Sequence, residues 1–349
     1  MPCDVFIVGG GPAGLAAAIA ARLKGFTVTV VDAARPPIDK ACGEGLLPSA
    51  PAALARLGIQ IEREQAFPIL GIRFVGDGAS VEASFPAGFG FGMRRTVLHR
   101  VLADRAAELG VKLLWGEHQK HLPDRSSYHW LIGADGQNSR VRNMAGLDRV
   151  SRESARFGFR RHYQIEPWSD HIEVHWASGS QIYVTPVGPS EVGIALLARD
   201  PHLRLDGGLQ RFPDLQRRLA GAAFSSTERG AITRSRQFQR VYCDRTVLIG
   251  DASGSVDAIT GEGLSLAFDQ AIALAAALVS EDPEKYQIEH RRLERRPMLM
   301  ADFMLLLDRS PWLRRRVLRL LAARPVIFEN LLAMHVGKPR FEIAAAAAR

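Results

Sequence analysis

A short glycine-rich run near the start of the chain has the spacing of a phosphate-binding turn. Its residues are Gly9, Gly10, Gly11, Pro12, Ala13 and Gly14. In such a turn Gly9 allows a tight bend, Gly11 lets the backbone approach a pyrophosphate, and Gly14 lets a helix pack closely on a strand. Asp32 follows about 20 residues later, where a carboxylate accepts hydrogen bonds from ribose hydroxyls. The pattern predicts a dinucleotide site, and a glycine-rich turn without a ligand is the alternative.

The residues around this run predict the elements that would position it. Residues 5–8 fit a buried parallel strand, residues 15–24 fit a helix ended by Gly25, and residues 27–31 fit a second strand. A pyrophosphate would then meet free N–H groups at the positive end of the helix. The carboxylate of Asp32 would repel a 2′-phosphate, which disfavours NADP at this site.

Two acidic turns and two helix starts farther along the chain could complete such a site. Asp135 and Gly136 follow one predicted strand, and Gly250 and Asp251 follow another. Either pair alone fits an ordinary turn. Arg95 begins a helix with one apolar face, for which an exposed arginine is the alternative. A second helix start, formed by Gly261, Glu262 and Gly263, carries partial positive charge if the helix forms.

Together these motifs resemble the three FAD contacts of the p-hydroxybenzoate-hydroxylase superfamily, over about residues 4–285. The resemblance implies FAD as the cofactor. It places Asp135 and Gly136 near the pyrophosphate, Asp251 after Gly250 on the ribitol chain, and Arg95 in contact with the cofactor. It also points the helix that follows Gly261, Glu262 and Gly263 at the pyrimidine edge of the flavin, where it would stabilise the reduced ring.

Two segments are most similar to the geranylgeranyl-reductase branch of that superfamily, namely residues 40–48 and residues 261–265. A third segment departs from it. Only Pro186 matches the branch's Tyr-x-Trp-x-Phe-Pro element, and the Trp-x-Trp-x-x-Pro element of flavin halogenases is missing too. The departure counts against both a polyprenyl tunnel and halogenation.

Several side chains are candidates for catalysis or substrate contact. Cys42 is the thiol nearest the expected flavin, with Lys40 as a source of positive charge, and Glu44 could relay protons. The alternatives are a small buried hydrophobe and a solvated loop acid. Tyr183 and His175 are the substrate candidates, taken from a group that also includes His162, Tyr163 and Trp176. Packing is the alternative for each.

Composition bounds the class of protein. The chain has 349 residues, enough for two domains, and its three cysteines have no metal-like spacing, so we predict no metal site and a reducing compartment. No basic leader precedes an apolar stretch, and the longest apolar run, residues 271–279, is too short to span a membrane. These features predict a cytoplasmic protein.

The net charge of +8 is concentrated in two arginine clusters, at residues 291–296 and residues 314–319. The second cluster lies on an amphipathic segment that suits the inner surface of an anionic membrane, although a solvated face over a packed stripe gives the same pattern. Nucleic acid is disfavoured because the basic residues lack interleaved aromatics.

These patterns predict an α/β fold, α+β overall, in three regions. A Rossmann-like FAD domain with a parallel sheet would take residues 1–59, 93–150 and 237–283. A substrate domain with a mainly antiparallel sheet would take residues 60–92 and 151–236. A helical region, interrupted by Pro297, Pro311 and Pro325, would take residues 284–349.

The predicted function is an FAD-dependent oxidoreductase acting on a hydrophobic small molecule, with NAD(P)H or an electron carrier as donor. The sequence slightly favours a monooxygenase, which would hydroxylate its substrate with reduced flavin and oxygen. The first alternative is a reductase that saturates a carbon–carbon double bond of an isoprenoid or related lipid. The second is a non-catalytic flavin-binding module that docks on membranes.

Overall fold

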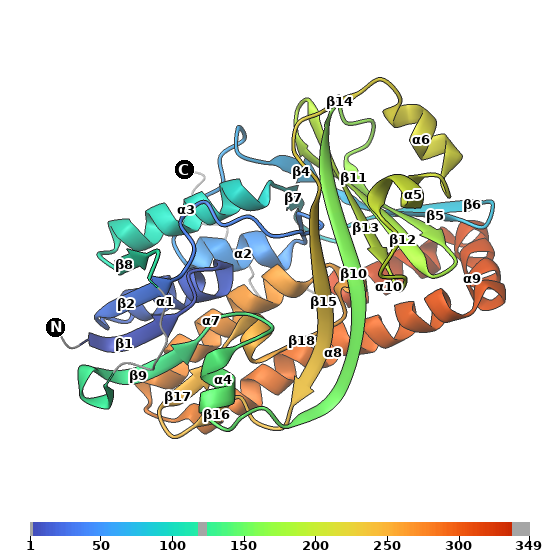
Figure 1. The fold of residues 1–349 in the computed structure, drawn as a ribbon. Coiled ribbons are helices and arrows are strands. Elements are labelled where there is room, and N and C mark those ends of the chain that lie inside the picture. The colour runs from blue at the N-terminus through green and yellow to red at the C-terminus, as the bar shows by residue number, and fades with distance from the viewer. Residues whose placement is uncertain (1–2, 118–123, 337–349) are drawn as a thin grey trace, which may run out of the picture.

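A six-stranded sheet forms one half of the protein in the computed structural model, which describes residues 3–117 and 124–336 (Figure 1). Its order is β16-β17-β9-β1-β2-β8. The strands are β1 (Cys3–Val8), β2 (Val28–Asp32), β8 (Lys112–Trp115), β9 (Tyr128–Gly133), β16 (Tyr242–Cys243) and β17 (Thr246–Leu248). All neighbours are parallel except β16 and β17. The central strands read as continuous apolar runs because helices cover the sheet, as predicted.

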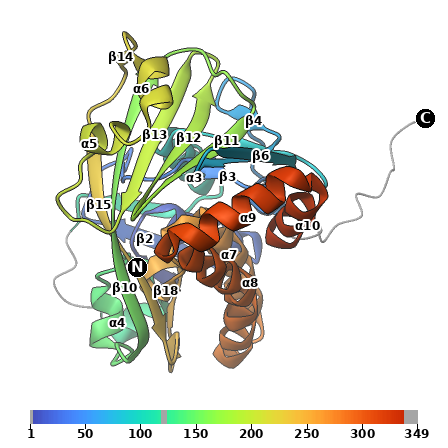
Figure 2. The same cartoon turned by 90° about the vertical axis from the view of Figure 1, so that its right-hand side faces the viewer.

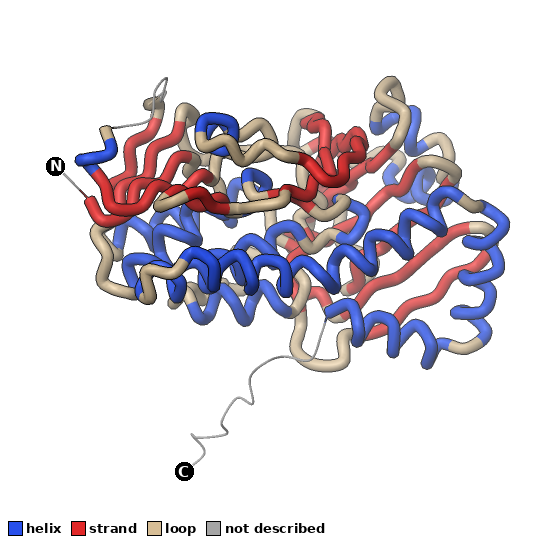
Figure 3. The backbone as a smooth tube through the Cα atoms, turned by 90° about the horizontal axis from the view of Figure 1, so that it is seen from below, coloured by secondary structure: helices blue, strands red, loops and turns tan. Residues whose placement is uncertain are grey.

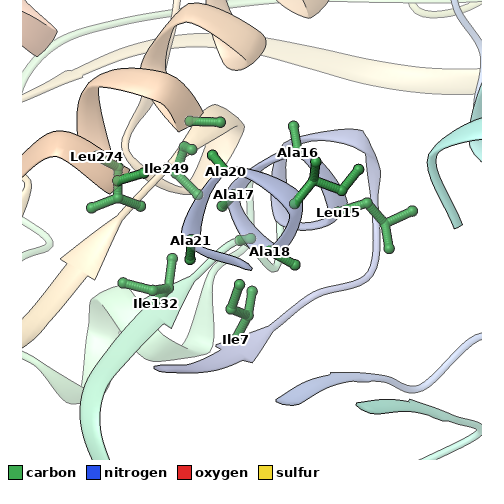
Figure 4. Packing of buried hydrophobic residues seen from close by; sticks show 14 of the residues in the cluster. Ile7, Leu15, Ala16, Ala17, Ala18, Ala20, Ala21, Ile132, Ile249 and Leu274 are labelled. Carbon is green, nitrogen blue, oxygen red and sulfur yellow. The ribbon is translucent and has the colours of Figure 1, made fainter. Parts of the chain in front are cut away.

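Four helices accompany this sheet: α1 (Pro12–Leu23), α2 (Ser49–Arg56), α3 (Arg95–Glu108) and α7 (Gly263–Val279). Helix α1 packs against both α3 and α7. Small side chains make this possible, since a run of buried alanines on α1 meets Ile7, Ile132, Ile249 and Leu274 (Figure 4). The close packing fixes the first turn of α1 against the ends of β1 and β9.

A nine-stranded sheet forms the other half, in the order β18-β15-β10-β13-β12-β11-β5-β6, with β14 paired to β10. Its strands are β5 (Gly71–Gly76), β6 (Ala79–Ser84), β10 (Val150–Gln164), β11 (His171–Ala177), β12 (Ser180–Gly188), β13 (Glu191–Ala198), β14 (Ala223–Phe224), β15 (Arg229–Phe238) and β18 (Gly254–Ser255). Every pairing is antiparallel except β5 with β11. The mainly antiparallel second sheet is therefore confirmed.

Short elements complete the connections within and between the two sheets. A three-stranded sheet joins β3 (Gly45–Leu46), β7 (Gly90–Gly92) and β4 (Phe67–Ile69). The short helices are α4 (Arg140–Met144), α5 (Leu205–Leu209), α6 (Pro213–Leu219), η1 (Arg125–Ser127), η2 (Gly250–Ala252) and η3 (Ala258–Thr260). Strand β18 lies within the segment predicted for the FAD domain but pairs with β15 of the second sheet. The predicted domain boundaries stay a prediction.

Three C-terminal helices complete the described chain: α8 (Pro283–Arg309), α9 (Pro311–Ala323) and α10 (Pro325–Val336). Helix α8 contacts β16 and α7 at one end and α9 at the other, so it extends along both halves (Figures 1 and 3). Helices α9 and α10 pack on β6, at the edge of the second sheet (Figure 2). Much of the predicted helical region lies here, but residues 337–349 lie outside the described part.

One expectation about these helices is wrong. Pro311 and Pro325 begin helices, as their fixed φ favours, but Pro297 does not interrupt α8, which continues through it. A proline inside a helix loses one hydrogen bond and clashes with the preceding turn. Pro297 is buried, so tertiary packing around it offsets that local cost.

Candidate functional site

The first glycine turn forms a cradle that only glycines fit. Gly9 has a φ of +112°, and a Cβ on Gly14 would lie 1.9 Å from the Gly9 carbonyl oxygen. In contrast, a Cβ on Gly11 would meet no described atom within 4 Å, so this backbone stays open to a ligand. Gly11 is also the N-cap of α1, Pro12 starts the helix, and no side chain of the described chain caps it. The N–H groups of this turn are thus suited to bind phosphate.

Asp32 ties the end of β2 to that cradle. Its two carboxylate oxygens accept hydrogen bonds from the backbone N–H groups of Gly10 and Ala34, both at 2.7 Å. The side chain also lines the cavity described next. The geometry is the one in which a carboxylate at the strand end accepts ribose hydroxyls.

A single cavity of about 790 Å³ starts at the glycine cradle and continues between the two sheets toward the C-terminal helices. Gly9, Gly11, Pro12 and Ala13 line its first end, which we call the nucleotide end. Its second end, which we call the apolar end, is lined by Phe74, Ile172, Val174, Met304, Phe328 and Leu332, among other residues. This volume lies within the range of small-molecule sites, and the cavity has markedly different chemistry at its two ends.

The second predicted motif holds a helix as well as lining the cavity. Asp135 accepts hydrogen bonds from the Ser139 hydroxyl at 2.5 Å and from the backbone N–H of Arg140 at 2.7 Å. Asp135 therefore holds the start of α4. This is the role that an acidic residue has in an ordinary turn, which was the alternative to a cofactor contact. Gly136, with a φ of +81°, has no described atom within 4 Å of a built Cβ and lines the cavity.

The third predicted motif pairs with a lysine from the loop after β2. Asp251 lies 2.9 Å from Lys40 Nζ, and both side chains are partly exposed beside the cavity. Lys40 is thus the partner of Asp251 rather than a charge aimed at Cys42. Gly250 bends at a φ of +60°, and its N–H is held by Gln270 of α7. The predicted contact of Asp251 with a ribitol chain stays a prediction.

Two helix starts face the cavity between these motifs. Arg95, the first residue of α3, lines the cavity, and its buried Nε has no hydrogen-bond partner in the described chain. A buried donor without a partner fits a site in which a bound ligand supplies the hydrogen-bond acceptor. Gly261 and Gly263 line the cavity at the start of α7, and a Cβ on either meets no described atom within 4 Å.

Glu262, which separates those two glycines, is buried beside α10 instead of lining the cavity. Its carboxylate lies 3.4 Å from His335 Nδ1 and 3.8 Å from Arg296. Burial raises the pKa of Glu262 to about 8 and lowers the pKa of His335 to about 4. Both groups are therefore neutral near pH 7, and their contact is not an ion pair there.

The loop at residues 40–46 brings Cys42 and Glu44 to the cavity wall. Cys42 Sγ accepts a hydrogen bond from the Glu44 N–H at 3.4 Å. Glu44 is only 2% exposed and adopts a φ of +58°, which is unusual for a residue other than glycine. The alternative of a solvated loop acid is wrong, because Glu44 is held by Arg95 N, at 2.8 Å, and by the ring of His162.

Of the two substrate candidates, the structure brings only Tyr183 to the cavity. Its hydroxyl donates to the Ile259 carbonyl at 2.7 Å, and burial raises the pKa of this phenol. His175 lies among the strand residues that face away from the cavity, where it is hydrogen-bonded to Glu173 at 2.9 Å and meets the Phe212 ring edge to face. Neighbours on a strand alternate between faces, so Ile172 and Val174 line the cavity and His175 does not. His175 therefore lies outside the cavity.

Sequence reasoning missed the buried charges that hold the cavity walls. Asp308 of α8 accepts hydrogen bonds from Arg156 and Arg199, both at 2.8 Å, and another from Gln181. Arg156 also lies 3.3 Å from Asp257, beside η3. The available signal was the spacing of Arg152, Arg156 and Arg160 along β10, which puts them on one face of the strand but does not identify partners far away in the chain.

Comparison with known proteins gives the same picture. Residues 4–65 match the model of a family described as an FAD binding domain. The chain is 32% identical over 321 residues to a menaquinone reductase of Mycolicibacterium smegmatis, covering 79% of this chain and 76% of that protein. It is 27% identical over 319 residues to a digeranylgeranylglycerophospholipid reductase of Methanothrix thermoacetophila, covering 80% and 78%. A crystal structure of a flavoprotein/dehydrogenase from Cytophaga hutchinsonii matches with a TM-score of 0.81 at 20% identity, covering 97% and 93%.

The residues of the nucleotide end fit the group that these comparisons indicate. An open glycine cradle, a carboxylate at the end of β2 and the partnerless Nε of Arg95 suit the phosphates and ribose of a dinucleotide. The cofactor of this chain is FAD. Among residues 3–117 and 124–336 we find no cluster of metal-ligating side chains, and no helix there is long and apolar enough to cross a bilayer.

Proposed function

Because this chain belongs to the FAD-dependent p-hydroxybenzoate-hydroxylase superfamily, in its geranylgeranyl-reductase-like branch, we propose that it reduces a carbon–carbon double bond of an isoprenoid lipid. One observation carries the proposal. The cavity continues from the nucleotide end into an apolar end that a hydrocarbon chain would fill. The family membership makes this protein an oxidoreductase, so the alternative of a non-catalytic module is set aside.

FAD, when bound, supplies the hydride that such a reduction requires. The chain's own residues do the rest. The glycine cradle and Arg95 hold the cofactor, while Phe74, Val174 and Phe328 surround the hydrocarbon and exclude water. The start of α7, at Gly263, presents its positive end to the cavity. Such preorganised dipoles stabilise negative charge in the reduced state without reorganisation.

Saturating a double bond also requires a proton, and we assign its delivery to the loop that carries Cys42 and Glu44. Both residues line the cavity between its two ends. Glu44 carries the dissociable carboxyl group there, and Cys42 accepts the Glu44 N–H, so the thiol helps to hold the strained backbone of residue 44. Tyr183 shapes the wall beyond them, toward η3.

Hydroxylation, which the sequence alone slightly favoured, is the second candidate. The observation behind it is unchanged, since Pro186 is the only match to the prenyl-reductase element within residues 181–186. The apolar end nevertheless suits a chain better than a small activated ring, because its lining is almost wholly hydrocarbon over several helices and strands. We therefore place reduction first.

The two candidates differ in the product. The FAD-loaded protein would be reduced chemically under argon and mixed with an isoprenoid quinone or a geranylgeranyl lipid in detergent. We expect a product heavier by two hydrogen atoms, seen by mass spectrometry. A product that appears only with oxygen and gains one oxygen atom would establish hydroxylation instead. Repeating the reaction with NADH, NADPH or reduced ferredoxin identifies the electron donor.

We also propose that α9 touches the inner surface of an anionic membrane, where such a substrate would reside. Helix α9 differs from the predicted amphipathic segment with an exposed arginine cluster. Leu318 and Leu321 pack inward, and Arg314 is buried against Asp77 at 2.7 Å. Trp312 stays 63% exposed, with the Arg316 guanidinium 4.2 Å above its ring. A tryptophan among arginines suits a lipid interface.

The membrane contact can be measured by flotation with vesicles. We expect binding to vesicles that contain phosphatidylglycerol, weak binding to phosphatidylcholine alone, and loss of binding in a Trp312→Ala, Arg316→Ala variant. Equal flotation of the variant and the wild type would assign the basic face of α9 to solvent.

A further inference from the structure

A buried chain of polar side chains begins at Glu44, on the cavity wall, and leads toward the surface. The carboxylate of Glu44 contacts His162 Nε2, and both side chains are at most 2% exposed. The other ring nitrogen of His162 lies 2.7 Å from the hydroxyl of Ser226, which is partly exposed. Glu44 follows β2 in the chain, whereas His162 is on β10 and Ser226 follows β14. Only the fold brings them together.

The neighbouring charges fix the direction of these hydrogen bonds. Arg160 Nη1 lies 3.2 Å from His162 Nδ1, and a guanidinium can only donate. His162 Nδ1 is therefore an acceptor, so the ring carries its proton on Nε2 and donates it to Glu44. Ser226 Oγ accepts the His162 backbone N–H at 3.1 Å, which leaves the hydroxyl hydrogen free to point at Nδ1. Each member of the chain can thus pass a proton inward.

From this geometry we infer that Ser226 and His162 form a proton relay that reprotonates Glu44 during turnover. The inference rests on the proposed function, in which each hydride added to the double bond requires one proton on the other carbon. Glu44 gives a carboxyl proton to that carbon and takes the Nε2 proton of His162. His162 Nδ1 takes the Ser226 hydroxyl proton, and Ser226 takes one from solvent. One solvent proton is consumed. Glu44 and Ser226 return to their starting state, whereas His162 is left with its proton on Nδ1 and exchanges protons with solvent to regain the Nε2 form before the next turnover.

The arrangement around the relay keeps it ready for this role. Arg160 forms an ion pair with Asp39 and lies 3.7 Å from Glu44 Oε1, so its guanidinium helps to position the Glu44 side chain. The Arg95 N–H fixes the other carboxylate oxygen. His162 and Ser226 do not line the cavity, and they act through Glu44 as positioning and proton-transfer groups.

The relay is tested with His162→Gln and Ser226→Ala, with His175→Gln as a matched control. His175 also forms a histidine–glutamate pair on the same sheet, with Glu173, but outside the cavity. In single turnover of the reduced enzyme we expect His162→Gln to lower the rate of lipid reduction on the order of 10²-fold. Ser226→Ala should lower it about tenfold, because water can replace a hydroxyl. His175→Gln should react as the wild type does.

Two further measurements separate a relay from a structural tie. The wild-type rate should be slower in deuterated water and should vary with pH, and both dependences should change in His162→Gln with FAD still bound. An unchanged rate and pH profile in His162→Gln would overturn the relay. If that variant loses FAD, Ser226→Ala decides between the two, because Ser226 does not line the cavity.

A spectroscopic readout tests the relay without any substrate. Nitrogen-15 NMR of labelled histidines should show His162 with its proton on Nε2, and Glu44→Gln should shift that resonance. The opposite tautomer would overturn the relay. If the wild type reduces no isoprenoid, the proposed function fails by itself, and the NMR result still decides whether the hydrogen bonds run inward.

Discussion

The two ends of the cavity are built from different parts of the chain and in different ways. The nucleotide end is made mostly of backbone, with glycines and one helix start drawn from residues 9–14 and a carboxylate at Asp32. The apolar end is made of side chains from β5, β11, α8, α9 and α10. A Cβ added to such a backbone either clashes with the fold or occupies the space of the ligand, whereas side-chain sites tolerate changes of shape. The two ends should therefore respond very differently to mutation.

The largest effect is expected at Gly14. A Cβ there would overlap the Gly9 carbonyl at 1.9 Å, so Gly14→Val should separate α1 from β1 and yield protein without FAD or in aggregates. Gly11→Ala is the matched variant, since its methyl group enters open cavity. It should fold with a nearly unchanged Tm but retain little FAD, as measured by absorbance after gel filtration. A yellow, stable Gly14→Val protein would contradict the close packing.

A smaller effect is expected at the apolar end, at Met304. This residue is 5% exposed and lines the cavity from α8. Met304→Trp would fill part of the apolar end, raising KM for a long isoprenoid about tenfold or more while FAD stays bound. Leu306→Trp, on the same helix but 52% exposed, is the control and should behave as the wild type. If Met304→Trp instead lost FAD, a change at the apolar end would also disturb the nucleotide end, and the two ends would not respond independently to mutation.

This contrast also explains how much the sequence could predict. The strand–helix–strand unit around the glycine turn is a local pattern with a fixed period, so the sequence predicts its elements, and the roles of the glycines and Asp32 in binding the cofactor stay a prediction. The position of Glu44 was not predicted, because its burial depends on His162, 118 residues away. Arg314 was predicted on a basic surface, yet it pairs with Asp77 across 237 residues. Partners at such separations leave no spacing signal in a single sequence.

Within the nucleotide end, the two acidic turns should differ in a measurable way. Asp135 holds the start of α4, so Asp135→Ala should lower the stability by about 1 kcal/mol, as loss of a helix cap does. Asp251 has only Lys40 as a side-chain partner in the described chain, so Asp251→Ala should leave Tm nearly unchanged. We expect Asp251→Ala to lose more FAD on dialysis than Asp135→Ala does. Equal retention would count against the ribitol contact.

The smallest effect is a pH dependence at Glu262 and His335, where the start of α7 meets α10. Burial raises the pKa of Glu262 to about 8 from its ordinary value of 4.5, so the folded state binds a proton that the unfolded state has released. The stability that this provides is complete below about pH 4.5 and is lost as pH rises through about 8. His335, whose pKa is lowered to about 4, has the opposite effect. Its contribution to the stability of the fold is complete above about pH 6.5 and is lost as pH falls through about 4.

Glu262→Gln removes the first of these dependences while keeping the shape of the side chain. The variant should match the wild-type Tm near pH 5 and exceed it by a few degrees near pH 9, because an amide carries no charge to bury. Scanning calorimetry of the FAD-bound proteins across this range would measure the difference. A wild-type Tm that rose with pH above 7 relative to Glu262→Gln would mean that Glu262 is ionised in the fold, with Arg296 at 3.8 Å as its partner. The contact between α7 and α10 would then depend on charge rather than on burial.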